Sequence, residues 1–216
     1  MVYKIILWVD GGCRNNGYPD AIGAYACIDV LRWGQNRTYK RPLHQGTPTS
    51  QRAEIAAIIL ALRTAWDKYE NELDSGPWLD VTIYTDSKYV HGIMTDWVYK
   101  WCRNGWNNSL GNEIANRDYI EQASEMDDKL KEVGSVTYIW VPREENNAAD
   151  EAVNEKLDEM EAERDRMQAK HKMAGRSIPQ SASIGMGASM SFSSLASAYP
   201  QVTAAGYHCG HYSCCS

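Results

Sequence analysis

The first strand-like segment of the chain constrains its fold more than any other feature. Residues 3–9 read Tyr-Lys-Ile-Ile-Leu-Trp-Val, with apolar side chains at both odd and even positions. Alternate side chains of a strand point to opposite faces of its sheet, so such a strand has to be covered on both faces. The segment therefore predicts a central strand with other layers packed on it.

Strand and helix patterns alternate through residues 1–160. Further strands are expected at 21–28, 37–43, 81–85 and 136–141. Helical spacing of apolar residues begins after Ser50, the expected N-cap of the first helix, and again after 87, near 116 and after Pro142. This order predicts an α/β fold: a five-stranded mixed sheet, three antiparallel strands and then two parallel ones, flanked by helices.

Composition sets the end of the chain apart. From Lys172 to Ser216 the only formal charges are Lys172 and Arg176, and Ser, Ala and Gly dominate. We expect one folded domain over 1–160, its last helix extending to about 170, and a disordered tail over 171–216. The tail ends in a His- and Cys-rich cluster, 208–215, whose spacing fits no standard zinc finger.

The charge balance restricts the partners of the chain only in part. The 22 Lys and Arg against 28 Asp and Glu give a formal charge of −6, unlike a dedicated nucleic-acid-binding domain. A local basic groove remains possible, and its candidates are Lys88, Lys100, Arg103 and Arg117. With no apolar run long enough for a bilayer and no signal peptide, we expect an intracellular protein, nuclear or cytoplasmic, without membrane contact.

Two of the expected strands end on an aspartate, Asp10 and Asp86. Open α/β sheets place their ligands at the carboxyl ends of strands, so these side chains are candidates for one crevice. Asp86 could instead cap a helix, and Glu54 and Asp150, near the starts of two helices, would each suit a helix dipole. Four carboxylates around one sheet repel one another, however, and together they favour a site for Mg²⁺ or Mn²⁺.

Four stretches, taken together, resemble type 1 ribonuclease H. They are VDGGCRNNG (9–17), TSQRAEIAAIILAL (49–62), IYTDSKYVHGIMTDWVYKWCRNGWNNSLGNEIANRDYI (83–120) and WVPREENNAAD (140–150). They occur in the order and at the separations found in the family, and the third is similar to the helical handle of eukaryotic members. The resemblance covers residues 1 to about 158 and implies that 1–160 is a ribonuclease H catalytic domain.

The resemblance implies an active site of four acids, Asp10, Glu54, Asp86 and Asp150. Asp10 would bridge two Mg²⁺ ions (Mn²⁺ is an alternative), with Glu54 and Asp86 on one ion and Asp150 on the other. The implied activity of the monomer is endonucleolytic hydrolysis of the RNA strand of an RNA–DNA hybrid, giving 5′-phosphate and 3′-hydroxyl ends. Two alternatives stay open: a non-catalytic hybrid-binding module, and the detached nuclease domain of a reverse transcriptase or mobile element.

The resemblance also implies a set of substrate-binding residues. They are Asn16, Ser50 and Gln51 for the minor groove and the RNA 2′-hydroxyls, Thr49 and Asn116 for a DNA-strand phosphate, Trp97 and Trp101 for the DNA-strand channel, and Asn146. Taken without the resemblance, the segment around Asn16 is typical of a turn, and Trp97 and Trp101 are typical of helix packing.

The chain departs from the family pattern in three places. The segment before Asp150, residues 142–147, is short and lacks the His found there in many members. No histidine can therefore be assigned to proton transfer or product release. Thr47 stands where the phosphate pocket has an arginine, and the chain begins directly at its first strand, without an N-terminal hybrid-binding domain.

Overall fold

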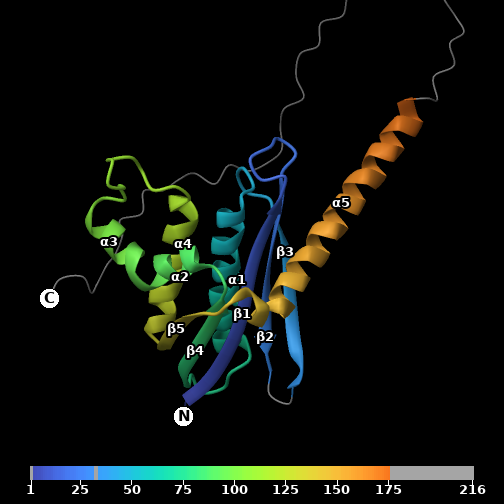
Figure 1. The fold of residues 1–216 in the computed structure, drawn as a ribbon. Helices are drawn as coiled ribbons and strands as arrows, with labels where there is room; N and C mark the ends of the chain where they lie inside the picture. The colour runs from blue at the N-terminus through green and yellow to red at the C-terminus, as the bar shows by residue number, and fades with distance from the viewer. Residues whose placement is uncertain (1, 32–33, 176–216) are drawn as a thin grey trace, which may run out of the picture. The chain divides into compact units, whose positions relative to one another are not determined.

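A five-stranded sheet forms the centre of the computed structural model, which describes residues 2–31 and 34–175 (Figure 1). Its strands are β1 (Val2–Arg14), β2 (Ile22–Val30), β3 (Asn36–Leu43), β4 (Trp78–Thr85) and β5 (Gly134–Trp140), in the spatial order β3-β2-β1-β4-β5. Strands β1, β2 and β3 are antiparallel neighbours, whereas β4 runs parallel to β1 and β5 parallel to β4. This confirms the predicted mixed sheet and places residues 3–9 in its central strand.

Helices lie on both faces of this sheet (Figure 1). On one face α1 (Ser50–Asn71) packs on β1 and β2, and α4 (Arg117–Lys131) packs on α1 and β5; on the other, α5 (Asn147–Gly175) lies across β1, β2 and β3. Between β4 and α4 the chain forms α2 (Lys88–Gly92), a π-helical turn η2 (Ile93–Trp97) and α3 (Val98–Arg103). A 3₁₀ turn, η3 (Arg143–Glu145), precedes α5.

The two faces of β1 are covered unequally. On the α1 side, Ile5, Leu7 and Val9 are at most 1% exposed and belong to the main core. On the other side Trp8 packs against a smaller cluster formed by Ala24, Ala26, Ile28, Ala149, Ala152, Val153 and Leu157. Ile6, beyond this cluster, is 37% exposed. The expected double cover is therefore complete only near the carboxyl end of the strand, where α5 begins.

Two helix boundaries differ from the sequence predictions. Thr49, and not Ser50, is the N-cap of α1, because its hydroxyl accepts a hydrogen bond of 3.2 Å from the backbone N–H of Arg52. Helix α5 continues to Gly175, past the expected end near 170, through a run of Glu, Arg, Gln, Ala and Lys that has high intrinsic helix propensity. The rest of the predicted tail, with its His and Cys cluster, lies outside the described residues.

None of the helices within the described ranges is long and apolar enough to cross a membrane.

Strand β1 and helix α1 approach most closely at Gly11. A Cβ atom on Gly11 would lie 2.2 Å from the carbonyl carbon of Ala53 and 2.3 Å from the backbone nitrogen of Glu54. Only glycine permits this contact between two backbones. Because Gly11 follows Asp10 directly, the contact also determines the spacing between Asp10 and the first turns of α1.

We expect Gly11→Ala to lower the free energy of unfolding by more than the roughly 1–3 kcal/mol typical of an overpacked core, since backbone atoms cannot rotate away. Urea unfolding followed by circular dichroism measures the loss. Gly12→Ala is the matched control, because its Cβ would meet side-chain atoms only, of Val153 at 2.9 Å and Leu157 at 3.5 Å. Equal losses in the two variants would contradict this account of the packing.

Candidate active site

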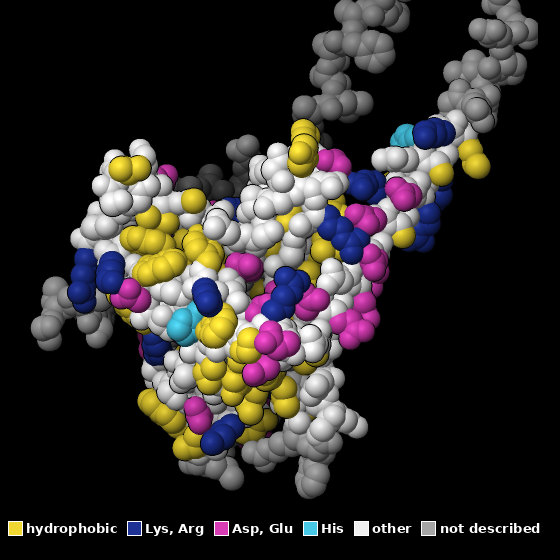
Figure 2. Space-filling view, viewed as in Figure 1, with side chains coloured by type: hydrophobic (Ala, Val, Ile, Leu, Met, Phe, Trp, Pro, Cys, Tyr) yellow, Lys and Arg dark blue, Asp and Glu magenta, His cyan; other side chains and the backbone are white. Residues whose placement is uncertain are grey.

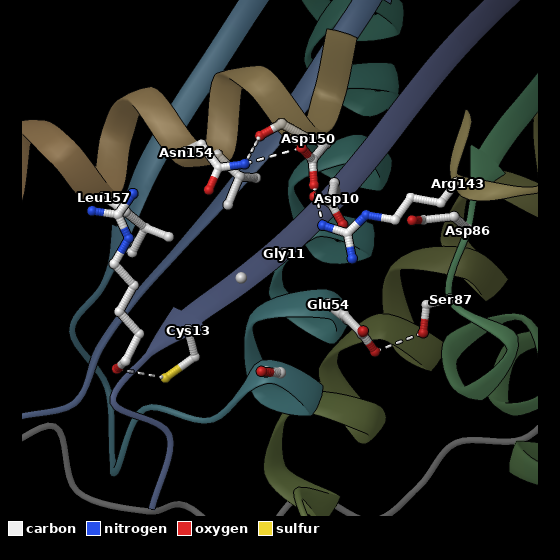
Figure 3. A pocket seen from close by; sticks show the side chains of 14 residues that line it. Asp10, Gly11, Cys13, Glu54, Asp86, Ser87, Arg143, Asp150, Asn154 and Leu157 are labelled. Atoms are coloured by element: carbon white, nitrogen blue, oxygen red, sulfur yellow. Dashed lines mark hydrogen bonds and ion pairs between the residues drawn. The ribbon is translucent and has the colours of Figure 1, made fainter. Parts of the chain in front are cut away.

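All four of the acids predicted from the sequence line one cavity of about 530 Å³ (Figure 3). Asp10 comes from the carboxyl half of β1, Glu54 from the second turn of α1, Asp86 from the residue after β4, and Asp150 from the first turn of α5. The cavity continues along α5 as far as Leu157. The carboxyl ends of two parallel strands and the starts of two helices therefore meet at one edge of the sheet.

Three of the acids have a polar partner within the protein. The hydroxyl of Ser87 donates a hydrogen bond of 2.6 Å to Glu54 Oε2, and the guanidinium of Arg143 forms an ion pair with Asp150 (Figure 3). Asp150 also accepts a hydrogen bond of 3.0 Å from the side-chain amide of Asn154. The third, Asp86, is held by Asn146.

Asn146 lies beneath the cavity and not on its surface. Its amide donates hydrogen bonds of 3.0 Å to Asp86 Oδ1 and of 3.0 Å to the carbonyl of Val9, and the side chain is buried, with the residue 1% exposed. Its backbone carbonyl accepts the N–H groups of Ala149 and Asp150 at the start of α5. In the structure the side chain therefore joins β1, Asp86 and α5, and the role of Asn146 in substrate binding stays a prediction.

The electrostatic cost of the site is greatest at Asp10. Burial raises the pKa of Asp10 from 3.8 to about 6, and the negative charges of Asp86 and Asp150 add to the effect. Burial also raises the pKa of Glu54, and Asp86 contributes, against the hydrogen bond from Ser87. The site therefore holds Asp10 in a position where its ionised form is disfavoured unless positive charge is nearby.

The donors of the cavity suit a hard divalent cation, although they are not gathered around one point. Among the described residues, no three His, Cys, Asp or Glu side chains are arranged to hold one metal ion. The atoms present are nevertheless carboxylate and amide oxygens, which Mg²⁺ and Mn²⁺ prefer. The buried Oδ1 of Asn146 has no hydrogen-bond partner, so an acceptor next to Asp86 is left for water or an ion. The residues therefore fit a magnesium site.

The predicted phosphate-binding residues Thr49 and Asn116 lie on either side of Arg52. Asn116, in the left-handed conformation with φ 60°, accepts a 3.3 Å hydrogen bond from Arg52, which itself is paired with Asp118 and stacks 4.1 Å above the Tyr119 ring. Thr47, where the family has an arginine, lies in an exposed bend. Sequence reasoning missed Arg52, and the available signal was its position three residues after Thr49 on the same helix end.

The predicted channel tryptophans form a row with a third aromatic residue. The ring centroids of Trp97 and Trp101 are 5.9 Å apart, and those of Trp97 and Tyr89 are 6.0 Å apart. Hydrophobic side chains gather over α2 and α3 in Figure 2. Tyr89 was not predicted, because a tyrosine in the first turn of a short helix carries no distinctive sequence signal. Burial raises the pKa of the Tyr89 hydroxyl and the side chain of Asn116 opposes this shift, so the aromatic row lies near the residues around Arg52.

The remaining predicted substrate residues lie at the rim. Asn16 is exposed in the turn after β1, Gln51 is exposed in the first turn of α1, and Ser50 lines the cavity with the acids.

Two of the four residues of the expected basic lining are paired with acids. Lys100 pairs with Asp96, and Arg117 pairs with Glu113 and Glu121. Lys88 lies 4.7 Å above the Trp140 ring. On the face shown in Figure 2, Lys and Arg side chains alternate with Asp and Glu and do not form one basic surface.

The ribonuclease H family model matches residues 3–161 of the chain. The chain belongs to the ribonuclease H family. Ribonuclease H of Francisella tularensis subsp. novicida is 30% identical over 160 residues, which cover 73% of this chain and 88% of the relative. Ribonuclease H of Clostridium botulinum (strain Hall) is 31% identical over 161 residues, covering 72% and 97%.

Solved structures share the fold of this ribonuclease H. LC11-RNase H1, isolated from compost by a metagenomic approach, matches with a TM-score of 0.53 and 23% identity over 73% of this chain and 97% of that one. The foamy viral protease-reverse transcriptase in complex with RNA/DNA hybrid matches with a TM-score of 0.56 and 20% identity, over 70% of this chain and 19% of that one. These structures show the shared fold, and the family match assigns residues 3–161 to a ribonuclease H domain.

Without divalent cations, Asp10→Asn should stabilise this ribonuclease H at pH 7.5 and not at pH 4. Folding raises the pKa of Asp10 from 3.8 to about 6, so the natural chain loses stability as pH rises through this interval. A shift of about two pKa units corresponds to roughly 3 kcal/mol, which is an upper bound. Thermal unfolding in EDTA at both pH values measures the effect.

The control for this experiment is Asp74→Asn, which removes an exposed carboxylate far from the four acids in sequence. It should leave Tm unchanged at both pH values. A stabilisation by Asp10→Asn of equal size at pH 4 and pH 7.5 would contradict the assigned cause.

Proposed function

We propose that this ribonuclease H hydrolyses the RNA strand of RNA–DNA hybrids with two Mg²⁺ ions, leaving 5′-phosphate and 3′-hydroxyl ends. The observation that carries the proposal is the convergence of Asp10, Glu54, Asp86 and Asp150 on one cavity. Relatives about 30% identical are ribonucleases H, and LC11-RNase H1, which shares the fold, has been solved in complex with RNA/DNA hybrid. Both facts support the assignment of substrate.

The four carboxylates of Asp10, Glu54, Asp86 and Asp150 would hold the two ions. When bound, the ions lower the pKa of the attacking water and stabilise the leaving 3′ oxygen. The protein's own residues keep the carboxylates in place: Asn146 holds Asp86, and Ser87 holds Glu54. Mn²⁺ has the same preference for oxygen donors and is the alternative cofactor.

Arg143 occupies the segment in which many family members have a histidine. Its side chain is 75% exposed, and Asp150, Asp10 and Asp86 all raise the pKa of its guanidinium. A planar guanidinium binds two phosphate oxygens at once. We infer that Arg143 would contact the phosphate of the RNA strand, and that Asp150 would help to hold the metal.

Substrate choice would depend on the two sides of the cavity. Asn16, Ser50 and Gln51 offer hydrogen bonds to the minor groove, where 2′-hydroxyls distinguish RNA from DNA. Around Arg52, Thr49 and Asn116 would bind a phosphate of the DNA strand, while Trp97 and Trp101 line its path.

Two alternatives use the same fold. A non-catalytic hybrid-binding module would have no need of four mutually repelling carboxylates. A detached nuclease domain of a reverse transcriptase or mobile element would share the proposed chemistry, and the fold match to the foamy viral protein is compatible with that origin.

We expect Asp10→Asn to reduce hybrid cleavage by at least about 1,000-fold, equivalent to roughly 4 kcal/mol in the barrier, because it removes the ligand shared by both ions. The variant should still bind the hybrid. A gel with a labelled hybrid, single-stranded RNA and duplex DNA, with and without Mg²⁺, measures activity and specificity. Full activity of the variant would overturn the metal assignment, and absence of cleavage by the natural chain would favour the binding module.

The pH dependence of cleavage should lack a histidine step. At saturating Mg²⁺, the rate from pH 5.5 to 9 should rise with ionisation of the attacking water, without a separate inflection near the ordinary histidine pKa of about 6.5. The nearest titratable residues of the short segment are Glu144 and Glu145. An inflection near 6.5 that disappears in His44→Ala or His91→Ala would show instead that another histidine has this role.

A pre-steady-state burst of product would indicate that product release limits turnover.

A further inference from the structure

The helices α2 and α3 lie between β4 and α4 (Figure 1). One π-helical turn, Ile93–Trp97 (η2), connects them and ends on Trp97, the middle member of the aromatic row. Within it the N–H of Val98 donates to the carbonyl of Ile93, five residues back. In a regular α-helix, residues five apart lie about 140° apart around the axis, so side chains 92 and 97 would not face each other. The wider turn brings Trp97 over Gly92, and π-helical turns are frequent at functional sites.

The indole ring of Trp97 lies directly on the backbone of Gly92. A Cβ atom on Gly92 would be 2.8 Å from Cζ2, 3.0 Å from Cε2 and 3.1 Å from Cη2 of this ring. The backbone of Gly92 is ordinary right-handed helix, with φ −61° and ψ −38°, which every residue adopts. The glycine is therefore required by the ring of Trp97 and not by the backbone conformation.

Gly92 thereby determines the position of the middle member of the aromatic row. Trp97 is inclined at 60° to Tyr89 and at 53° to Trp101, and is only partly buried, so part of the ring remains accessible. A methyl group at position 92 would push the ring away from this position. None of the atoms nearest to that methyl group belongs to Tyr89, so Tyr89 would remain where it is and the row would be interrupted at Trp97.

We propose that Gly92 is a positioning residue for the DNA strand: together with the π-helical turn, its missing side chain fixes the Trp97 ring where the strand packs on it. This inference rests on the proposed function, because it takes the aromatic row to be the path of the DNA strand. Packing of nucleotides on aromatic rings is sequence-tolerant, so the device controls affinity and not sequence preference.

The test compares Gly92→Ala with Trp97→Ala in the full chain. We expect Gly92→Ala to raise KM for hybrid cleavage and the Kd for a labelled hybrid in EDTA by about tenfold, with kcat within twofold of the natural value. Trp97→Ala should have a similar effect, and the double variant should be no worse than Trp97→Ala alone. Thr95→Ala, an exposed change in the same turn, is the matched control and should leave KM unchanged.

Thermal stability provides a second readout. Alanine normally stabilises a helix relative to glycine. Gly92→Ala should therefore lower Tm when Trp97 is present and raise it in the Trp97→Ala background, because only the ring opposes the methyl group. Phenylalanine has a smaller ring than tryptophan. Adding Trp97→Phe to Gly92→Ala should therefore restore part of the hybrid affinity that Gly92→Ala alone loses.

Two results would overturn the proposal. The first is that Gly92→Ala leaves KM and Kd unchanged. The second is that Gly92→Ala raises KM and Kd as much in the Trp97→Ala background as in the natural chain. If Gly92→Ala does not fold, the double variant, which lacks the ring, can still be compared with Trp97→Ala. A lower Tm in the double variant than in Trp97→Ala would also overturn the proposal. Absence of cleavage by the natural chain would count against the proposed function, whereas the Kd and Tm comparisons would still decide the role of Gly92.

Discussion

The contact between the backbones of β1 and α1 at Gly11 is the constraint on which the rest of the site depends. At Gly11 no side chain separates the central strand from the first helix, so Asp10 and the first turns of α1 lie close together. The parallel pairing of β4 with β1 then brings Asp86 to the same edge of the sheet. The last helix completes the arrangement by packing its first turns on the other face.

Holding carboxylates together in this way opposes folding, and the structure limits the cost locally. Three acids have side-chain partners of different kinds: a hydroxyl for Glu54, an amide for Asp86, and both a guanidinium and an amide for Asp150. Asp10, at the centre, has the pKa raised to about 6 by burial and by its neighbours. The apolar clusters on the two faces of the sheet therefore supply the stability of the fold. The carboxylates at its edge repel one another, which suits this edge to binding cations.

The sequence was sufficient for the sheet and for the meeting of the acids. Apolar runs and alternation define the strands, and carboxyl ends of parallel strands share an edge, so pattern alone made Asp10 and Asp86 candidates for one crevice. The same pattern left helix capping open as the role of Asp86. Ser and Thr are both preferred N-cap residues, so the sequence could not distinguish Thr49 from the adjacent Ser50 as the N-cap of α1. The burial of Asn146 and the π-helical turn depend on tertiary packing, for which a single sequence contains no periodic signal.

The length of α5 has a mechanical consequence. Its 29 residues correspond to a rod of about 43 Å that has Asp150 at one end and Gly175 at the other. Arg14 clamps it through ion pairs of 2.7 Å to Asp158 and 2.6 Å to Glu161, and the apolar residues before this clamp are fixed to the sheet. Bending or fraying of the turns after Glu161 therefore does not displace the carboxylate of Asp150 at the start of the helix.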